Sequence, residues 1–393
     1  MRLAVSIAAA MLFSAATARA GEVKNETHAG RAVRVFVPSK VATPALVVML
    51  HGCTQTPEGF ADATQMDVVA EESGFVVAYP EQPSSVGTGN CWRWWDPAHQ
   101  TRDGGEPRSI ADAAEAVARA HGVDPERVYV AGISAGGAMS VILGATHPDR
   151  FTAIGVIAGL EYKAATAFSE VLGASGGGGP DPSTQGDLAY AQMGSRARAL
   201  PVLVIHGTAD GVVAKINGDQ VAAQWLRTNT RVLGDGAIEA VTDRGEAGYA
   251  FVRELHRSKE SGASIVEHVV VEGLGHAWPG GKQGGSYSDP KGPDASRMLW
   301  SFFRERTSSA PLAAPSSPAP APPTGAGGGG DADTGGAEAS SPASTSNGCA
   351  ISASGRARDA IAWLAIAVAL GCARRARRAR RAHSSVSNFP APR

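Results

Sequence analysis

Hydrophobic residues along the chain form short continuous runs that polar and glycine-containing segments separate. Residues 45–50, 74–79 and 128–131 are runs of this kind, and the largely apolar residues 151–158 and 201–206 are interpreted as further buried strands. Residues 265–271 are predicted to be a late strand, whereas residues 33–37 alternate between apolar and polar positions. A continuous apolar run of this length is typical of a strand buried on both faces of a parallel sheet. Alternation is typical of a half-buried strand.

Segments between these runs have helical spacing. Residues 110–121 place Ile110, Ala114 and Val117 on one face, and residues 135–146, 220–229 and 294–303 are further predicted helices. Alternation of strands and helices predicts an α/β fold with a mostly parallel central sheet and helices on both faces. Residues 21–307 would form a single domain of this kind.

Composition supports one folded domain with extensions. Hydrophobic residues make up 43% of the 393 residues, which excludes a wholly disordered chain. Much of the excess of Gly and Pro falls in residues 308–348, which consist almost only of Ser, Ala, Pro, Gly and Thr. Such a segment cannot bury a core, so it is predicted to be a linker.

The net charge of −1 is the sum over segments whose charges differ in sign. Residues 21–307 carry a net charge of −8, residues 308–393 carry +5, and the first 20 residues hold two Arg and no acid. An acidic folded region argues against a nucleic-acid partner, because nucleic-acid binders are normally strongly basic.

The first 20 residues have the organisation of a secretory signal peptide. A basic start is followed by an apolar run and by the small-x-small sequence Ala18-Arg19-Ala20. We therefore expect a secreted or cell-surface protein, the alternative being an uncleaved anchor.

The last 45 residues combine Cys349, a short apolar stretch at residues 360–373 and six Arg between Arg374 and Arg381. This order resembles the MYXO-CTERM type of C-terminal sorting tail. The resemblance implies a transmembrane helix that holds the protein transiently at the membrane before processing near Cys349. A plain membrane anchor is the alternative, although about 20 residues are usual for a spanning helix.

Four cysteines are present, of which Cys349 and Cys372 belong to the tail. Cys53 and Cys91 remain for the folded domain. Because disulfides persist outside the cytoplasm, we expect a Cys53–Cys91 bridge.

Residues 132–136 read Gly-Ile-Ser-Ala-Gly and match G-x-S-x-G. They follow the predicted strand 128–131 and open the predicted helix 135–146. This strand–turn–helix context is what a nucleophile elbow requires, so Ser134 is the predicted nucleophile. The alternative is a glycine-rich packing turn.

A serine hydroxyl needs a base, and in α/β-hydrolases the acid and the histidine follow the serine along the chain. Asp210 and His276 each follow a predicted buried strand within a glycine-containing loop. We therefore predict that His276 is the base and that Asp210 orients it. His206 begins its own loop and is interpreted as structural, and Asp243 lies in a glycine-rich connection with no clear strand before it.

The oxyanion hole of such an enzyme consists of two backbone N–H groups. Ala135, the residue after the nucleophile, should supply one, and Cys53, in the loop after the strand 45–50, should supply the other. The alternative is that Cys53 is only a structural half-cystine.

Five segments in this order resemble the polyhydroxybutyrate (PHB) depolymerase family of esterases, a group related to the feruloyl and acetylxylan esterases. They are residues 51–55, 90–95, 132–137, 207–210 and 275–281. The resemblance covers residues 24–305 and implies an α/β-hydrolase fold, a Ser-Asp-His triad, and neither a metal nor an organic cofactor. After Arg306 we expect only the linker and the tail, without a second folded domain for binding polymer granules. This expectation favours soluble oligomers, amorphous polyester or plant-wall esters over crystalline polymer.

Aromatic residues near these motifs suggest a substrate surface. Trp278 lies two residues after His276, and Trp92 lies beside Cys91. We predict that Trp278 and Trp92 bind substrate, the alternative being that such rings pack in the core. Residues 169–194, which include four consecutive glycines, are interpreted as a mobile insertion at the mouth of the site or as a surface loop.

The sequence thus predicts an exported, monomeric serine esterase acting on a PHB-type polyester or its oligomers. A feruloyl or acetylxylan esterase acting on plant cell-wall esters is the alternative. An inactive surface binding protein on a hydrolase scaffold is the alternative from another class.

Overall fold

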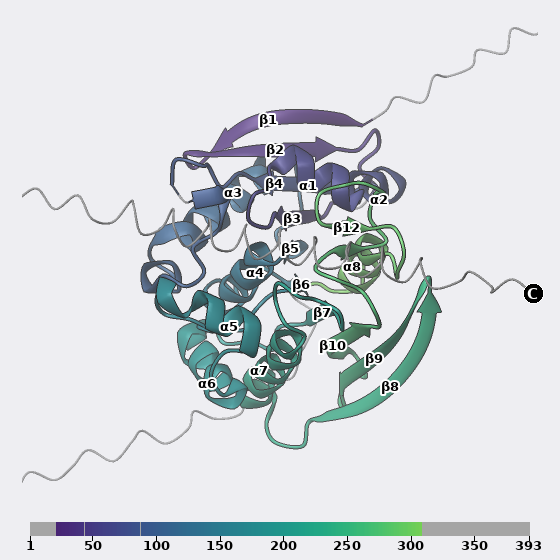
Figure 1. Ribbon diagram of the computed structural model, residues 1–393. Helices are drawn as coiled ribbons and strands as arrows, with labels where there is room; N and C mark the ends of the chain where they lie inside the picture. The colour runs from purple at the N-terminus through teal and green to yellow at the C-terminus, as the bar shows by residue number, and fades with distance from the viewer. Residues whose placement is uncertain (1–20, 43, 87, 309–393) are drawn as a thin grey trace, which may run out of the picture. The chain divides into compact units, whose positions relative to one another are not determined.

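The computed structural model describes residues 21–42, 44–86 and 88–308, and one ten-stranded sheet organises them (Figure 1). The strand order across the sheet is β1-β2-β4-β3-β5-β6-β7-β10-β9-β8. The strands are β1 (Glu22–His28), β2 (Arg31–Val37), β3 (Leu46–Leu50), β4 (Val76–Pro80), β5 (Val128–Ile133), β6 (Ala153–Ile157), β7 (Val202–Gly207), β8 (Ile238–Ala247), β9 (Tyr249–Ser258) and β10 (Ser264–Val271). A separate pair consists of β11 (Trp278–Pro279) and β12 (Ser288–Asp289).

The six central strands, from β4 to β10 in this order, run parallel to one another. Every residue of β3, β4, β5, β6 and β7 is buried, as the continuous apolar runs predicted. Antiparallel strands complete both edges, β2 and β1 beyond β4, and β9 and β8 beyond β10. The predicted fold class is therefore confirmed.

Helices cover both faces of the sheet (Figure 1). They are α1 (Pro57–Thr64), α2 (Met66–Ser73), α3 (Gly105–Ala120), α4 (Ala135–Thr146), α5 (Val171–Gly177), α6 (Pro182–Met193), α7 (Ile216–Leu233) and α8 (Ala295–Arg304). Helices α1, α2 and α8 share one hydrophobic core with the central strands. Helices α3, α4 and α7 pack on the opposite side, with α5 and α6 outside them (Figure 1).

The last helix closes the core on the α1–α2 side. Trp300 stacks on Phe75 with 3.9 Å between ring centroids, and Phe303 stacks on Tyr129 at 4.8 Å. The helix begins at Asp294, whose side chain accepts a hydrogen bond from the Arg297 N–H at 3.0 Å, the usual cap of a helix N-terminus. Residues from the two ends of the described region therefore meet in one core.

Several elements differ from the sequence-based expectation. Strands β1, β8 and β9 were not predicted, because they carry no continuous apolar run; β1 and β8 are largely exposed, and β9 is mostly half-buried. Asp243 accordingly lies within β8 rather than in a connection. Residues 169–194 form helices α5 and α6 instead of a loop, and α6 begins with an Asp181 cap followed by Pro182.

The predicted signal peptide and most of the predicted linker, as well as the whole sorting tail with Cys349 and Cys372, lie outside the described residues. Within the described ranges, none of the helices has both the length and the apolar character needed to span a bilayer.

Candidate active site

Ser134 stands at the turn between β5 and α4 in an unusual backbone conformation. Its φ of 58° and ψ of −122° lie outside the regions that most non-glycine residues occupy. Its N–H donates to the Ile157 carbonyl of β6 at 2.9 Å, and the residue is partly exposed. A strained turn that presents a serine at the end of a buried strand is the geometry of a nucleophile elbow.

Gly136 explains how the elbow and the loop after β3 come together. A Cβ atom at this position would lie 2.1 Å from the Leu50 carbonyl oxygen and 2.7 Å from that of His51. Because no side chain fits there, the first turn of α4 lies directly against the loop that begins at His51. The predicted oxyanion loop and the predicted nucleophile are therefore neighbours.

Asp210 and His276 meet at the same edge of the sheet, from the loops after β7 and β10. His276 Nδ1 lies 2.7 Å from Asp210 Oδ2. Asp210 Oδ1 accepts hydrogen bonds from the N–H groups of Val212 and Val213, both at 2.9 Å. The Asp210 carboxylate is thus fixed at both oxygens, and an Nδ1–H of His276 directed at it leaves Nε2 free to take a proton.

His206, which the sequence suggested was structural, also supports this carboxylate. Its buried Nε2 lies 3.0 Å from the Val213 carbonyl and 3.5 Å from Asp210 Oδ2. Burial of Asp210 acts to raise its pKa, but hydrogen bonds from His206 and His276 and the charge of His276 outweigh it. The pKa of Asp210 is therefore lowered well below its usual value, and the group is ionised at neutral pH.

The elbow and the Asp210–His276 pair lie at the carboxyl edge of adjacent parallel strands, with only β6 between β5 and β7. Among the described residues, no hydrogen bond joins the Ser134 hydroxyl to His276. Such bonds are often long in unliganded enzymes and shorten when substrate binds.

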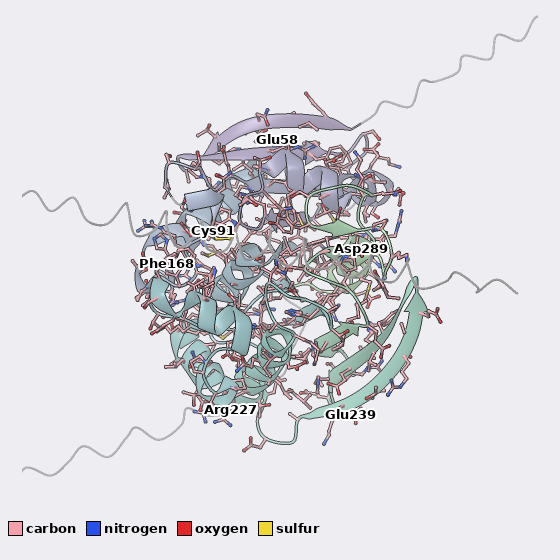
Figure 2. All side chains as sticks on the ribbon, in the orientation of Figure 1. Glu58, Cys91, Phe168, Arg227, Glu239 and Asp289 are labelled. Carbon is pink, nitrogen blue, oxygen red and sulfur yellow. A yellow bond between two sulfur atoms is a disulfide. The ribbon has the colours of Figure 1, made fainter. Side chains whose placement is uncertain are left out.

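The oxyanion loop is held by several contacts. Cys53 and Cys91 form a disulfide, as expected (Figure 2). The Gln55 side chain accepts from the Gly52 N–H at 2.8 Å and donates to the Ser286 carbonyl at 2.9 Å. Burial lowers the pKa of His51 to about 4, so its ring is neutral at pH 7.

Both predicted oxyanion donors have backbone N–H groups available to a ligand. The Ala135 N–H belongs to the first turn of α4, where helical N–H groups have no partner in their own helix. The Cys53 N–H makes no hydrogen bond within the part of the chain that the structure describes.

The substrate-binding assignments of Trp92 and Trp278 are wrong in this structure. Trp92 has an exposed fraction of 0% and Trp278 of 1%, so neither ring can contact a substrate. Trp278 packs edge-on against Phe60 and donates from Nε1 to Ser296 Oγ at 3.1 Å. The alternative that the sequence left open, core packing, applies to both.

Tyr287 is the aromatic residue that the structure places beside the predicted base. Its ring lies edge-on to His276 with 5.9 Å between centroids, and 38% of the residue is exposed. Its φ of 50° belongs to the left-handed region, which turns the chain at this point. No motif surrounds Tyr287, so the sequence offered no signal for it.

Groups of three or more His, Cys, Asp or Glu side chains arranged to hold a metal ion do not occur in the described ranges.

Comparisons with known proteins agree with this geometry. Residues 32–248 match the family model of the esterase PHB depolymerases. Poly(3-hydroxyalkanoate) depolymerase C of Paucimonas lemoignei is 34% identical over 246 residues, which cover 62% of this chain and 57% of that protein. The match therefore spans little more than half the length of that relative.

Two acetylxylan esterases are also similar. Acetylxylan esterase A of Emericella nidulans is 30% identical over 264 residues, which cover 64% of this chain and 81% of that protein. The solved structure of the acetyl xylan esterase from Aspergillus awamori has a TM-score of 0.58 at 22% identity. It covers 72% of this chain and 99% of that one, and at this identity it supports the fold alone.

A family match over more than half of the chain thus coincides with an α/β-hydrolase fold. The chain belongs to the esterase PHB depolymerase family and is a carboxylic ester hydrolase.

Proposed function

We propose that this chain is an exported serine esterase that works through an acyl-enzyme, with Ser134 as nucleophile, His276 as base and Asp210 as its orienting acid. The observation that carries the proposal is the 2.7 Å contact between His276 Nδ1 and Asp210 Oδ2 at the sheet edge where Ser134 occupies its strained turn.

The reaction has two halves. Ser134 Oγ attacks the ester carbonyl carbon while its proton passes to His276 Nε2, and the N–H groups of Cys53 and Ala135 hydrogen-bond the oxyanion. Collapse of the intermediate breaks the bond to the alcohol, which leaves with the proton from His276. Water, deprotonated by His276, then attacks the acyl-enzyme carbonyl carbon. The bond from this carbon to Ser134 Oγ breaks, His276 returns the proton to Oγ, and the carboxylic acid is released.

For the substrate, we propose a PHB-type polyester or its oligomers. The similarity to a poly(3-hydroxyalkanoate) depolymerase supports this choice. A feruloyl or acetylxylan esterase is the second candidate, and the longer coverage of acetylxylan esterase A favours it. Initial rates on hydroxybutyrate oligomers, methyl ferulate and acetylated xylan discriminate the two, and a clear preference for ferulate or xylan overturns our ranking.

Export through residues 1–20, a linker at 308–348 and a sorting or anchor tail at 349–393 complete the proposal. These segments lie wholly or mostly outside the described residues, so the division stays a prediction from their composition.

The nucleophile assignment is tested with Ser134→Ala on p-nitrophenyl butyrate. We expect kcat to fall by at least about 10³-fold, because the acyl-enzyme cannot form. Ser183→Ala, which removes an exposed hydroxyl at the start of α6, is the matched control and should keep full activity. Equal rates for wild type and Ser134→Ala contradict the assignment.

A further inference from the structure

Glu106 is a buried carboxylate that the proposed chemistry does not use. It lies in the first turn of α3, with an exposed fraction of 3%. The positive end of the helix dipole favours a negative charge there. Even so, burying a carboxylate is unfavourable unless hydrogen bonds and charges compensate for the lost water, so its contacts show what the position requires.

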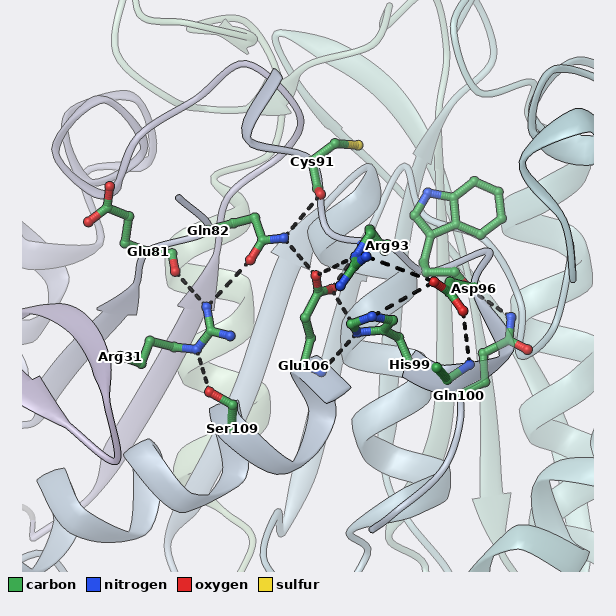
Figure 3. Close-up of polar contacts among 12 residues, drawn as sticks. Arg31, Glu81, Gln82, Cys91, Arg93, Asp96, His99, Gln100, Glu106 and Ser109 are labelled. Carbon is green, nitrogen blue, oxygen red and sulfur yellow. Dashed lines mark hydrogen bonds and ion pairs between the residues drawn. The ribbon is translucent and has the colours of Figure 1, made fainter. Parts of the chain in front are cut away.

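Both carboxylate oxygens of Glu106 accept hydrogen bonds (Figure 3). Oε1 accepts from Gln82 Nε2 at 2.6 Å, and Oε2 accepts from the backbone N–H of Arg93 at 2.8 Å. The Arg93 guanidinium adds a longer contact, with Nε at 3.5 Å from Oε1.

The backbone of Glu106 is fixed as well. Its N–H donates to His99 Nδ1 at 2.9 Å. This approach depends on Gly105, where φ is +64° and a Cβ atom would lie 2.8 Å from the same nitrogen. The start of α3 is therefore built around the His99 ring, and the Glu106 carboxylate has a defined position.

Gln82 connects Glu106 to the oxyanion loop. This side chain is fully buried, and its second amide hydrogen is directed at the Cys91 carbonyl, 3.3 Å away. Its backbone N–H donates to His51 Nε2 at 3.2 Å. One residue thus contacts the Glu106 carboxylate, the disulfide segment and the first residue of the oxyanion loop.

The segment 91–93 is clamped on both sides of Trp92. Gln82 holds the Cys91 carbonyl, and Glu106 holds the Arg93 N–H. Between them, Trp92 Nε1 donates to the His51 carbonyl at 2.9 Å, and Cys91 is bonded to Cys53. Displacement of this segment therefore moves the loop that carries the Cys53 N–H.

We propose that Glu106 is a positioning residue for the oxyanion loop, acting through Gln82 and the backbone of residues 91–93. The proposal rests on the proposed function, in which the Cys53 N–H binds the oxyanion. A backbone donor contributes to catalysis only when it points at the place where negative charge develops, so its misplacement lowers kcat more than substrate affinity.

The experiment compares Glu106→Ala and Glu106→Gln with wild type on p-nitrophenyl butyrate. We expect kcat of Glu106→Ala to fall about 10- to 100-fold, less than the loss of a whole oxyanion donor, while KM stays within about twofold. Glu106→Gln should recover part of this loss, because its amide oxygen still accepts one of the two hydrogen bonds. It also serves as the test variant should Glu106→Ala fail to fold.

A second readout follows the transition-state geometry. The rate at which a p-nitrophenyl phosphonate modifies Ser134 should fall in parallel with kcat, because the phosphonyl oxygen occupies the oxyanion hole. Glu267→Gln is the matched control, since Glu267 is a similarly buried carboxylate. It lies on β10 and pairs with Arg253 of β9, away from this loop. The control variant should lower the thermal midpoint without changing kcat.

The outcomes separate the two proposals. A Glu106 variant that loses thermal stability as Glu267→Gln does, but keeps kcat and the phosphonylation rate within about twofold, overturns the positioning role. A rise in KM at unchanged kcat overturns it as well, by assigning Glu106 to substrate binding. Failure of the proposed function is recognised independently, by full activity of Ser134→Ala.

Discussion

Tyr287 brings an exposed ring to the proposed base from a loop that no sequence motif marks. Replacing Tyr287 with Ala should lower kcat/KM about 2- to 12-fold, the range expected when one aromatic contact is lost. Tyr287→Phe should keep most of the activity, because the ring rather than the hydroxyl faces His276. Steady-state kinetics on an aromatic ester such as methyl ferulate measure the effect.

Trp278→Phe is the contrasting variant. Its ring is buried against Phe60 and bonded to Ser296, so the substitution should lower the thermal midpoint and leave KM unchanged. A large change in KM for Trp278→Phe, with none for Tyr287→Ala, would restore the tryptophan as the substrate contact.

Glu161 is a buried acid whose carboxylate oxygens have no hydrogen-bond partner in the described part of the chain. Burial, together with the charge of Asp181, raises its pKa to about 8. Between about pH 4.5 and 8 the folded state therefore holds a proton that the unfolded state has lost. As the pH rises through this window, the contribution of Glu161 to the free energy of unfolding falls by about 1.4 kcal/mol per pH unit.

Glu161→Gln removes this penalty, because an amide does not ionise. The variant should be more stable than wild type at pH 8, and the difference should shrink as the pH approaches 4.5. Urea unfolding at both pH values measures it. Ser183→Ala, which alters an exposed residue without an ionisable side chain on α6, is the control and should change the free energy of unfolding equally at both pH values. An equal difference at both pH values would mean that Glu161 does not titrate in this window.

At the scale of elements, the disulfide ties the loop after β3 to the segment before α3. The two cysteines are 38 positions apart. In the chain-entropy model, closing a loop of that length lowers the conformational entropy of the unfolded chain, which stabilises the folded state by about 4 kcal/mol at 25 °C. The double variant Cys53→Ala/Cys91→Ala should lose up to this free energy of unfolding.

Denaturant unfolding with and without a reductant measures the contribution of the disulfide. The reductant should destabilise wild type and leave the double variant unchanged. If it destabilises both equally, the effect does not come from this bond.

The sequence predicted those elements whose physical signal is local. Strands β3 to β7 were found because burial on both faces requires a continuous apolar run. Ser134, Asp210 and His276 were chosen as candidates because each follows a predicted buried strand, and their roles stay a proposal. Strand β8 was not predicted because its residues are nearly all exposed and form no apolar run, although it pairs with the next strand, β9.

The direction in which a side chain points was the main feature of the site that the sequence could not predict. Trp92 and Trp278 lie beside functional residues in the sequence, but composition does not say whether a ring faces solvent or core. Glu106 is 53 positions from Cys53 and becomes its neighbour only through Gln82 and the disulfide segment. The spacing of these residues along the chain does not predict this series of contacts.

For the whole molecule, three buried histidines contribute to the response to acid. Burial lowers the pKa values of His51, His147 and His268 to about 4 each. Between about pH 6.5 and 4 the unfolded state binds protons that the folded state excludes. Their contribution to stability is therefore present above pH 6.5 and is lost as the pH falls through 4, by about 1.4 kcal/mol per histidine per pH unit.

Above pH 4.5, the effect of Glu161 on stability has the opposite sign and offsets the effect of one of the three histidines. For these four groups together, acidification therefore still lowers the free energy of unfolding. Unfolding free energies at pH 7, 6 and 5 should decline, and His147→Gln should flatten the slope by about 1.4 kcal/mol per pH unit. A slope that does not change in this variant would show that His147 binds its proton equally well in both states.

The position of α8 also bears on when the molecule can fold. Its aromatic rings cover Phe75 and Tyr129, so the apolar face that contains these two residues stays open until the final helix has been synthesised. The domain can therefore complete its folding only after residue 304 has been synthesised. A nascent chain that stops at residue 248, where the family match ends, still lacks the partner of that face and exposes it to aggregation.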